Sequence, residues 1–363
     1  MDLNRIFMKN CCPTKVGGQA ILEGLLMRGS RAMATAVRLP DGDVHLTVEP
    51  LQAPSKVKKI PIVRGVYSFV SSLYMGTRVL MHSAEILEAF EVAAGKSAES
   101  SQEEAGKNSE NQKGKFETWL EKKFGENAAF NLAMGFSVLL AIAFVVGVFI
   151  LLPTFALELA EKAGLHSTIL LNLIEGVIRI AMFVAYISLI TLMPDIRRTF
   201  EYHGAEHKTI HCYENGLELT PENAQTFYTL HPRCGTSFMM FVMIISLLVF
   251  SFLGWPNLWV RVLSRIALIP VIAGLSYEVL QFTGRHNSAF VKAMSIPGIM
   301  LRKLTTKEPD LSQLEVAIIA MKAVLPSHEN PDLPVEYWVG RVHKDGTMEK
   351  DEEETAEYIK SKE

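Results

Sequence analysis

The sequence is poor in cysteine, has no basic surplus and carries no apolar run near its N-terminus. Four cysteines among 363 residues are too few and too irregularly spaced for a disulfide framework, which argues against a disulfide-stapled secreted domain. A formal net charge of −3 at pH 7 gives no reason to expect binding to nucleic acid. Residues 1–19 contain nothing like the apolar core of a signal peptide. We therefore expect any membrane targeting to come from internal segments.

Long hydrophobic runs, in contrast, are present. The mean hydropathy is +0.19 although 21% of the residues are charged, so the apolar residues must be concentrated in parts of the chain. A helix needs about 20 residues to cross a hydrocarbon core about 30 Å thick. Runs near or above this length occupy residues 132–157, 168–193, 237–255 and 259–282. A buried helix of a soluble domain could explain one run, but the series predicts a mainly α polytopic bundle of about four transmembrane helices.

The distribution of lysine and arginine predicts the orientation of these spans. Basic residues gather before the first run, between the second and third, and after the fourth, whereas the two opposite connections are short and poor in them. Cytoplasmic loops carry such an excess. We therefore expect a multi-pass protein of the cytoplasmic membrane with both termini and residues 194–236 on the cytoplasmic side, where reduced thiols also fit.

The regions outside the spans show weaker patterns. Alternation over 34–39 and 44–48 around Asp41-Gly42 predicts a β-hairpin. An apolar stripe over 62–90 predicts an amphipathic helix, packed on the membrane domain or lying at its surface. Ser312 and Glu315 form the pattern of a capping box, which predicts a helix reaching Leu325.

These patterns divide the chain into an N-terminal region with a small α/β element, a linker, a membrane domain and a C-terminal region. The low-complexity linker cannot bury a core and is predicted to be disordered. The C-terminal region is predicted to contain a helix followed by a solvated acidic tail. The predicted bounds are 1–92, 93–115, 116–300 and 301–363.

One polar segment carries a metal-binding pattern. Pro194 and Asp195 form a suitable helix start, and on that helix His203 and His207 stand one turn apart. With Glu206 they spell H-x-x-E-H, in which two histidines bind zinc and the glutamate activates water. His211 lies about 12 Å from His203 along the axis, so it suits contact with a ligand or with substrate better than a shared ion. The alternative is a polar helix face at the membrane surface.

Two ligands do not hold zinc, so a third must come from elsewhere. His231 and Cys234 lie together at the mouth of the third run, and both are ligand types that zinc accepts. Between them Arg233 would place a cation beside the site, where it could hold an anionic substrate or a developing oxyanion. The alternative for Arg233 is an anchor at the membrane interface.

Charged residues within the runs are a second signal, because ionisable groups inside a membrane are costly. Glu175 and Arg179 are four residues apart and are predicted to pair with each other. Glu278 has no such neighbour and either completes the metal site or extends its carboxylate to the interface.

Residues 16–29 (VGGQAILEGLLMRG) match neither a P-loop nor a dinucleotide fingerprint. Their glycines suggest a close backbone approach. Glu23 and Arg28 are candidates for a pair that lines the site, but a structural turn is the favoured interpretation.

Several long motifs also resemble a known family. GGQAILEGLLMRG, FEYHGAEHKTIHCYENGLELTPENA, HPRCGTSF and LTTKEPDLSQLEVAI are similar to the YqhQ family of bacterial membrane proteins, over residues 12–325 apart from the linker. The resemblance implies a membrane location and a predicted metal-dependent enzyme with metal at His203, His207 and His231. It implies no substrate.

The leading hypothesis is a zinc-dependent hydrolase at the cytoplasmic membrane surface, acting on a lipid head group or a juxtamembrane peptide. In it Glu206 is the general base and Arg233 steadies the oxyanion. The alternative is a transporter, metal-handling protein or assembly scaffold with a structural metal. A closed shell of His203, His207, His231 and Cys234 would favour that alternative, because catalytic zinc keeps an open position. A transporter with four spans would need to form a homo-oligomer.

Overall fold

The computed structural model describes residues 14, 16–51, 60–93, 136–231 apart from 138, 142, 163, 165 and 166, and then 237–252, 258–285, 289–330 and 333–360. The chain divides into two compact units. The first comprises Met1–Phe90, Val184–Leu248 and Leu268–Glu363, and the second comprises Glu91–Phe183 and Val249–Ala267. The predicted linker lies outside the described residues from position 94 onwards, and so do Arg233 and Cys234.

The first unit contains a six-stranded antiparallel sheet with the strand order β1-β2-β3-β4-β5-β6. Its strands are β1 (Gly17–Ile21), β2 (Gly24–Arg28), β3 (Ala32–Arg38), β4 (Val44–Pro50), β5 (Trp338–Val342) and β6 (Met348–Asp351). The predicted hairpin is confirmed as β3 and β4, and Gly42 in their turn adopts a φ of +94°, which glycine tolerates without strain. The last two strands come from the C-terminal region, so the sheet is larger than the hairpin.

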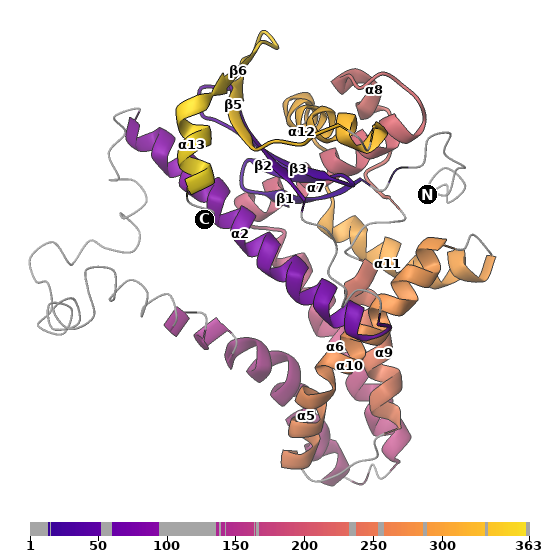
Figure 1. Cartoon of the computed structure of the whole chain (residues 1–363). Coiled ribbons are helices and arrows are strands. Elements are labelled where there is room, and N and C mark those ends of the chain that lie inside the picture. The colour runs from indigo at the N-terminus through magenta and orange to yellow at the C-terminus, as the bar shows by residue number, and fades with distance from the viewer. Residues whose placement is uncertain are drawn as a thin grey trace, which may run out of the picture. The chain divides into compact units, whose positions relative to one another are not determined.

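Helices cover both faces of this sheet. Because successive side chains of a strand point to opposite faces, Leu25 and Met27 belong to the core formed with α7 (Pro194–Glu214) and α12 (Leu311–Glu329). The neighbouring Leu26 packs on the other face, in a core shared with Val79 of α2 (Val63–Ala93). Figure 1 shows α12 and α2 on opposite faces of the strands. Burial on both faces explains the continuous apolar run Leu25–Met27 of β2. In β4, by contrast, apolar side chains alternate with the buried polar residues His45, Thr47 and Glu49.

The helix predicted from the C-terminal capping pattern is present as α12, but the cap itself differs. Asp310 accepts a hydrogen bond from the Gln313 amide nitrogen at 2.8 Å, and the Gln313 side chain accepts one from the Asp310 amide at 3.0 Å. The predicted box of Ser312 and Glu315 is therefore wrong by two residues. Glu315 pairs instead with Arg38, at 2.6 Å.

The acidic end of the chain, expected as a solvated tail, contributes strand β6 and the helix α13 (Glu352–Lys360). Glu354 accepts a hydrogen bond from the His45 ring at 2.8 Å, and Tyr358 donates one to Glu49. These contacts attach α13 to strand β4. Two further helices of the first unit, α8 (Pro221–Gln225) and α11 (Ala289–Thr305), complete the surroundings of the site described below.

Three helical segments of the described residues are long and apolar enough to cross a membrane: Leu139–Glu158, Leu170–Ile190 and Val262–Thr283. They belong to η2 (Gly147–Leu151) with α5 (Leu152–Lys162), to α6 (Thr168–Ile190) and to α10 (Leu258–Arg285). The remaining predicted span contains α9 (Ser237–Ser251), whose 15 residues fall short of the roughly 20 that a crossing requires. The protein is thus mainly helical with three candidate membrane helices, and the four-span bundle is not confirmed.

The second unit holds a buried network of charges. Arg179 donates to Glu175 at 2.8 Å, which confirms the predicted pair, and Arg265 of α10 contacts both oxygens of the same carboxylate. Thr154 of α5 donates to Glu175 at 3.1 Å and accepts from Arg265 at 2.8 Å. The Phe250 ring lies 5.7 Å from the Arg179 guanidinium carbon and 5.3 Å from that of Arg265. Spacing along the helix could predict Arg179, but not Arg265.

Candidate metal centre

Helix α7 begins at Pro194, as predicted, and carries the H-x-x-E-H pattern past the edge of the sheet. A close approach holds it there. A Cβ added to Gly204 would stand 2.0 Å from the carbonyl oxygen of Lys307, so only glycine allows the helix to contact the segment that follows α11. On this helix the His203 and His207 rings lie 4.5 Å apart, measured between their centroids.

Hydrogen bonds to backbone carbonyls determine which nitrogen of each ring carries the proton. The Nδ1 atom of His203 lies 2.8 Å from the carbonyl oxygen of Thr305, and that of His207 lies 2.5 Å from the carbonyl oxygen of Thr229. A carbonyl oxygen can only accept, so both Nδ1 atoms are protonated and donate. In each neutral ring the Nε2 atom then keeps its lone pair, which is the state that binds a metal ion.

Glu206 completes the group. Its Oε1 atom accepts a hydrogen bond from the Gly18 amide at 2.7 Å, and a Cβ at Gly18 would lie 3.0 Å from the carboxylate carbon. The close backbone approach expected of the glycine motif is therefore confirmed at Gly18, where strand β1 meets α7. Sequence reasoning did not connect the two motifs, because the contact joins residues 188 positions apart.

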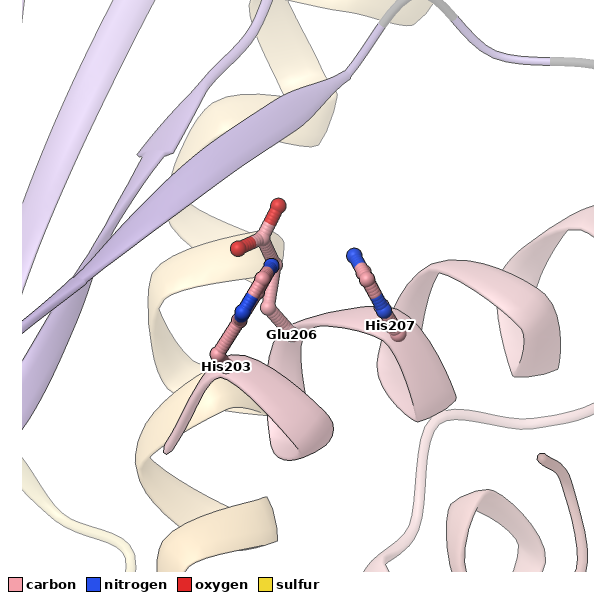
Figure 2. A group of neighbouring side chains, drawn as sticks. All are labelled: His203, Glu206 and His207. Carbon is pink, nitrogen blue, oxygen red and sulfur yellow. The ribbon is translucent and has the colours of Figure 1, made fainter. Parts of the chain in front are cut away.

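His203, Glu206 and His207 together offer three ligand atoms within 4.8 Å of one another. Figure 2 shows the three side chains extending from the same side of α7. All are buried, with 8%, 3% and 1% of their surfaces exposed, respectively. Two neutral imidazoles and a carboxylate form a donor set that suits a divalent ion such as zinc.

His231 lies beside this group rather than in it. Its ring is 6.0 Å from that of His207 and 4.6 Å from that of His211, and among the described residues it does not join the three-ligand cluster. Its Nε2 atom donates to Glu214 at 3.2 Å, and Glu214 also accepts from the Thr14 amide at 2.9 Å. Burial lowers the pKa of His231 to about 3, so the ring is neutral at pH 7. Its role as a ligand stays a prediction.

Two further polar residues of α7 lie in this neighbourhood. His211 donates through Nε2 to the carbonyl oxygen of Leu230 at 3.0 Å, which keeps it near His231 and away from His203. Glu214, to which sequence reasoning gave no role, orients His231. The spacing of three residues between His211 and Glu214 on one helix was the available signal, since such residues share a face.

The remaining candidates lie elsewhere. Glu278 pairs with Arg64, with 2.7 Å between Nε and Oε1, and among the described residues it does not join the three-ligand cluster. Its extension to the membrane interface stays a prediction. Glu23 pairs with Arg198 and stands in the turn that starts β2, whereas Arg28 ends that strand. The favoured structural turn is thus confirmed, and a Glu23–Arg28 pair is not formed. Arg233 and Cys234 lie outside the described residues, and their roles stay predictions.

Comparison with known proteins places the chain in a family. A model described as "Protein of unknown function (DUF1385)" matches residues 60–327. The chain is also 34% identical over 323 residues to "Uncharacterized protein YqhQ" of Bacillus subtilis (strain 168), a match that covers 87% of this chain and 94% of that protein. No solved structure matches. Neither description mentions a metal or a reaction. The chain belongs to the DUF1385 family.

Proposed function

We propose that this protein is a metal-dependent membrane enzyme, most simply a hydrolase, whose divalent ion is held by His203, Glu206 and His207. The main support for the proposal is that one ligand atom from each of these side chains lies within 4.8 Å of the others. In addition, the Nδ1 atoms of the two histidines and one oxygen of the glutamate are hydrogen-bonded to the backbone. Two histidines and one carboxylate are a ligand set typical of catalytic zinc, which leaves a position open for water or substrate.

A bound zinc ion would supply Lewis acidity and lower the pKa of a coordinated water towards about 7. The chain's own residues then have distinct tasks. The carbonyl groups of Thr229 and Thr305 fix the tautomers of the two histidines. The Gly18 amide holds one oxygen of Glu206, which supports a ligand role for this carboxylate in place of the general-base role expected from the motif. Arg233 remains the candidate for binding an anionic substrate or oxyanion.

The number of membrane crossings bears on where the proposed enzyme acts. We infer four crossings, because Glu175 and Arg265 lie near the N-terminal ends of two candidate spans and meet in one network. The helices α6 and α10 therefore leave the network in the same direction, and the chain must return between them. The apolar run 237–255, of which α9 is the described helix, is the candidate for that return, since Phe250 lies beside both guanidinium groups. With the basic segments cytoplasmic, a lipid head group or a juxtamembrane peptide is the proposed substrate class.

Burial of all three ligands favours a second candidate, a structural or transported metal. In that case a fourth protein ligand, His231 or Cys234, would close the shell and exclude water. The two candidates differ in one measurable property, which is whether a small exogenous ligand reaches the ion.

The test begins with metal content. The full-length protein purified in detergent should contain about one zinc per chain, and His207→Ala should lose it because two remaining ligands do not hold the ion. His343→Ala is the matched control, since His343 is partly exposed in the β5–β6 turn and pairs with Asp43. Equal metal content in the two variants would refute the site.

The second step separates the candidates. In the cobalt-substituted protein, added azide should change the visible spectrum if a position is open, and an unchanged spectrum would favour the closed structural site. Glu206→Gln should weaken metal binding if the carboxylate is a ligand. If Glu206→Gln instead keeps one metal ion per chain, the general-base role of Glu206 is favoured over the ligand role. General-base catalysis typically contributes about 10²–10⁴-fold in rate.

A further inference from the structure

One face of helix α2 packs against the sheet. Val79 belongs to the core on that face, and Met75, Ile86 and Leu87 pack against it. Gly76 also points inward, because a Cβ added there would stand 2.7 Å from the side chain of Gln19 on β1. These contacts define the buried face of α2, and the opposite face points away from the sheet.

That opposite face is exposed and mainly apolar, with Thr77 and Arg78 as the polar residues between Tyr74 and Met81. Val70, Leu73 and Tyr74 expose 57%, 63% and 70% of their surfaces, and a stripe of further large side chains continues the surface on neighbouring turns: Val63, Tyr67, Phe69, Leu80 and Met81. Soluble proteins rarely expose a contiguous apolar patch of this kind. Residues 63–81 contain no acidic side chain, whereas glutamates recur in the final third of the helix.

The start of α2 is attached to a candidate membrane helix. Arg64 pairs with Glu278, whose Oε1 atom also accepts from the Ile62 amide at 3.1 Å. A Cβ at Gly65 would lie 2.7 Å from the Cβ of Tyr277, so the two helices touch closely there. Glu278 precedes the end of the span Val262–Thr283 by five residues, which is about 7.5 Å of helix.

A second contact also joins the start of α2 to the end of an apolar helix. The Phe69 ring lies 5.6 Å from the ring of Phe238, one residue after the start of the apolar helix α9. The first turns of α2 thus pack against the ends of two apolar helices. The exposed stripe continues directly from these contacts along the same helix.

We propose that the exposed stripe of α2 is a lipid-binding surface, embedded between the head groups and acyl chains of the leaflet that contains Thr283. A helix with one apolar face lies in this plane when that face is buried in the interface. Tyrosines such as Tyr67 and Tyr74 suit this position, because their rings prefer the interface. The glutamates of the last third favour water, so the helix rises from the bilayer towards its C-terminal end.

The occupant is lipid rather than a second copy of the chain, because the stripe is continuous with helices that already require lipid around them. The proposal is independent of the metal. It does, however, place the bilayer surface one strand away from the candidate site, since β1 carries both Gln19, which meets α2, and Gly18, which holds Glu206.

Site-specific fluorescence quenching tests the proposal. Leu73→Cys and Tyr74→Cys, each labelled with bimane in the full-length protein, are reconstituted in phosphatidylcholine–phosphatidylglycerol vesicles that contain brominated lipids. Glu88→Cys is the matched control on the same helix, and the protein without an added cysteine gives the background. Because the side chains at positions 73, 74 and 88 are exposed, the three substitutions should leave the fold unchanged.

Brominated lipids should quench the labels at positions 73 and 74 several-fold more strongly than the label at 88. Equal quenching at the three positions would overturn the proposal. So would quenching that disappears as the protein-to-lipid ratio rises, because a second copy would then cover the stripe.

Discussion

In the part of the chain that the structure describes, two buried clusters of ionisable side chains are built in opposite ways. In the second unit, the Glu175 carboxylate faces the guanidinium groups of Arg179 and Arg265, so donors meet acceptors. In the first unit, His203 and His207 direct their donating nitrogens outward to carbonyl groups. Their lone pairs and the Glu206 carboxylate, all acceptors, lie close to one another.

The difference distinguishes the network of Thr154, Glu175, Arg179 and Arg265, here called the brace, from the proposed metal site. In the brace, two guanidinium groups share one carboxylate, and these contacts join α5, α6 and α10. A group of acceptors is stabilised by a cation, and ligand atoms that are already oriented towards one another bind it with little rearrangement. Burial alone would not have distinguished the two clusters, since Glu175 and Glu206 are similarly buried, with 2% and 3% exposed.

The largest effect on stability should come from removing the shared carboxylate of the brace. Glu175→Ala leaves Arg265, which is 5% exposed, without this counter-ion and should cost about 3–5 kcal/mol. Denaturant unfolding in detergent measures the change. Glu158→Ala is the control on α5, because its partner Lys162 is largely exposed and such pairs contribute about 0–1 kcal/mol. Similar losses in both variants would show that the network is not a brace.

A smaller and more specific effect should follow at the candidate metal centre. In Gly18→Ala the new Cβ would approach the carbonyl oxygen of Leu26 to 2.3 Å and displace the amide that holds Glu206. Metal affinity should fall about 10–100-fold, the usual effect of disturbing a group that orients a ligand.

Gly17→Ala is the matched control for this variant, because a Cβ there meets nothing within 4 Å. Competition with a fluorescent zinc chelator gives both affinities. An unchanged affinity in Gly18→Ala, with the fold intact, would contradict the positioning role of this amide.

The smallest effect should come from a neutral member of the brace. Thr154→Val keeps the side chain's shape but removes the hydroxyl that donates to Glu175 at 3.1 Å and accepts from Arg265 at 2.8 Å. The expected loss is about 1 kcal/mol, typical of a hydrogen bond between groups that retain other partners. Metal content should not change. A loss as large as that in Glu175→Ala would mean that the hydroxyl, rather than the charges, governs the network.

Local spacing accounts for what could be predicted from the sequence. The hairpin at Gly42, the start of α7 at Pro194 and the pairing of Glu175 with Arg179 each depend on residues within a few positions of one another. The same holds for the placement of His203 and His207 on one face. Such relations follow from the periodicity of helices and strands and do not depend on contacts between distant segments.

The shifted cap of α12 shows the limit of this reasoning. Asp310 and Ser312 both precede a suitable partner by three residues, so the motif alone does not choose between them. Asp310 follows Pro309 in extended backbone and becomes the cap, which places Ser312 inside the helix. The exact end of a helix is the feature that sequence patterns determine least well.

The apolar runs of membrane-spanning length follow from residue order alone, and so does the placement of two histidines and a glutamate on one helix. Folding of the unit fixes how these residues are used. It brought Gly18 to Glu206, the carbonyl groups of Thr229 and Thr305 to the histidines, and Arg265 to Glu175. The physical reason is that such contacts join distant segments whose meeting depends on the packing of the whole unit, whereas helical spacing depends only on the backbone between neighbouring residues.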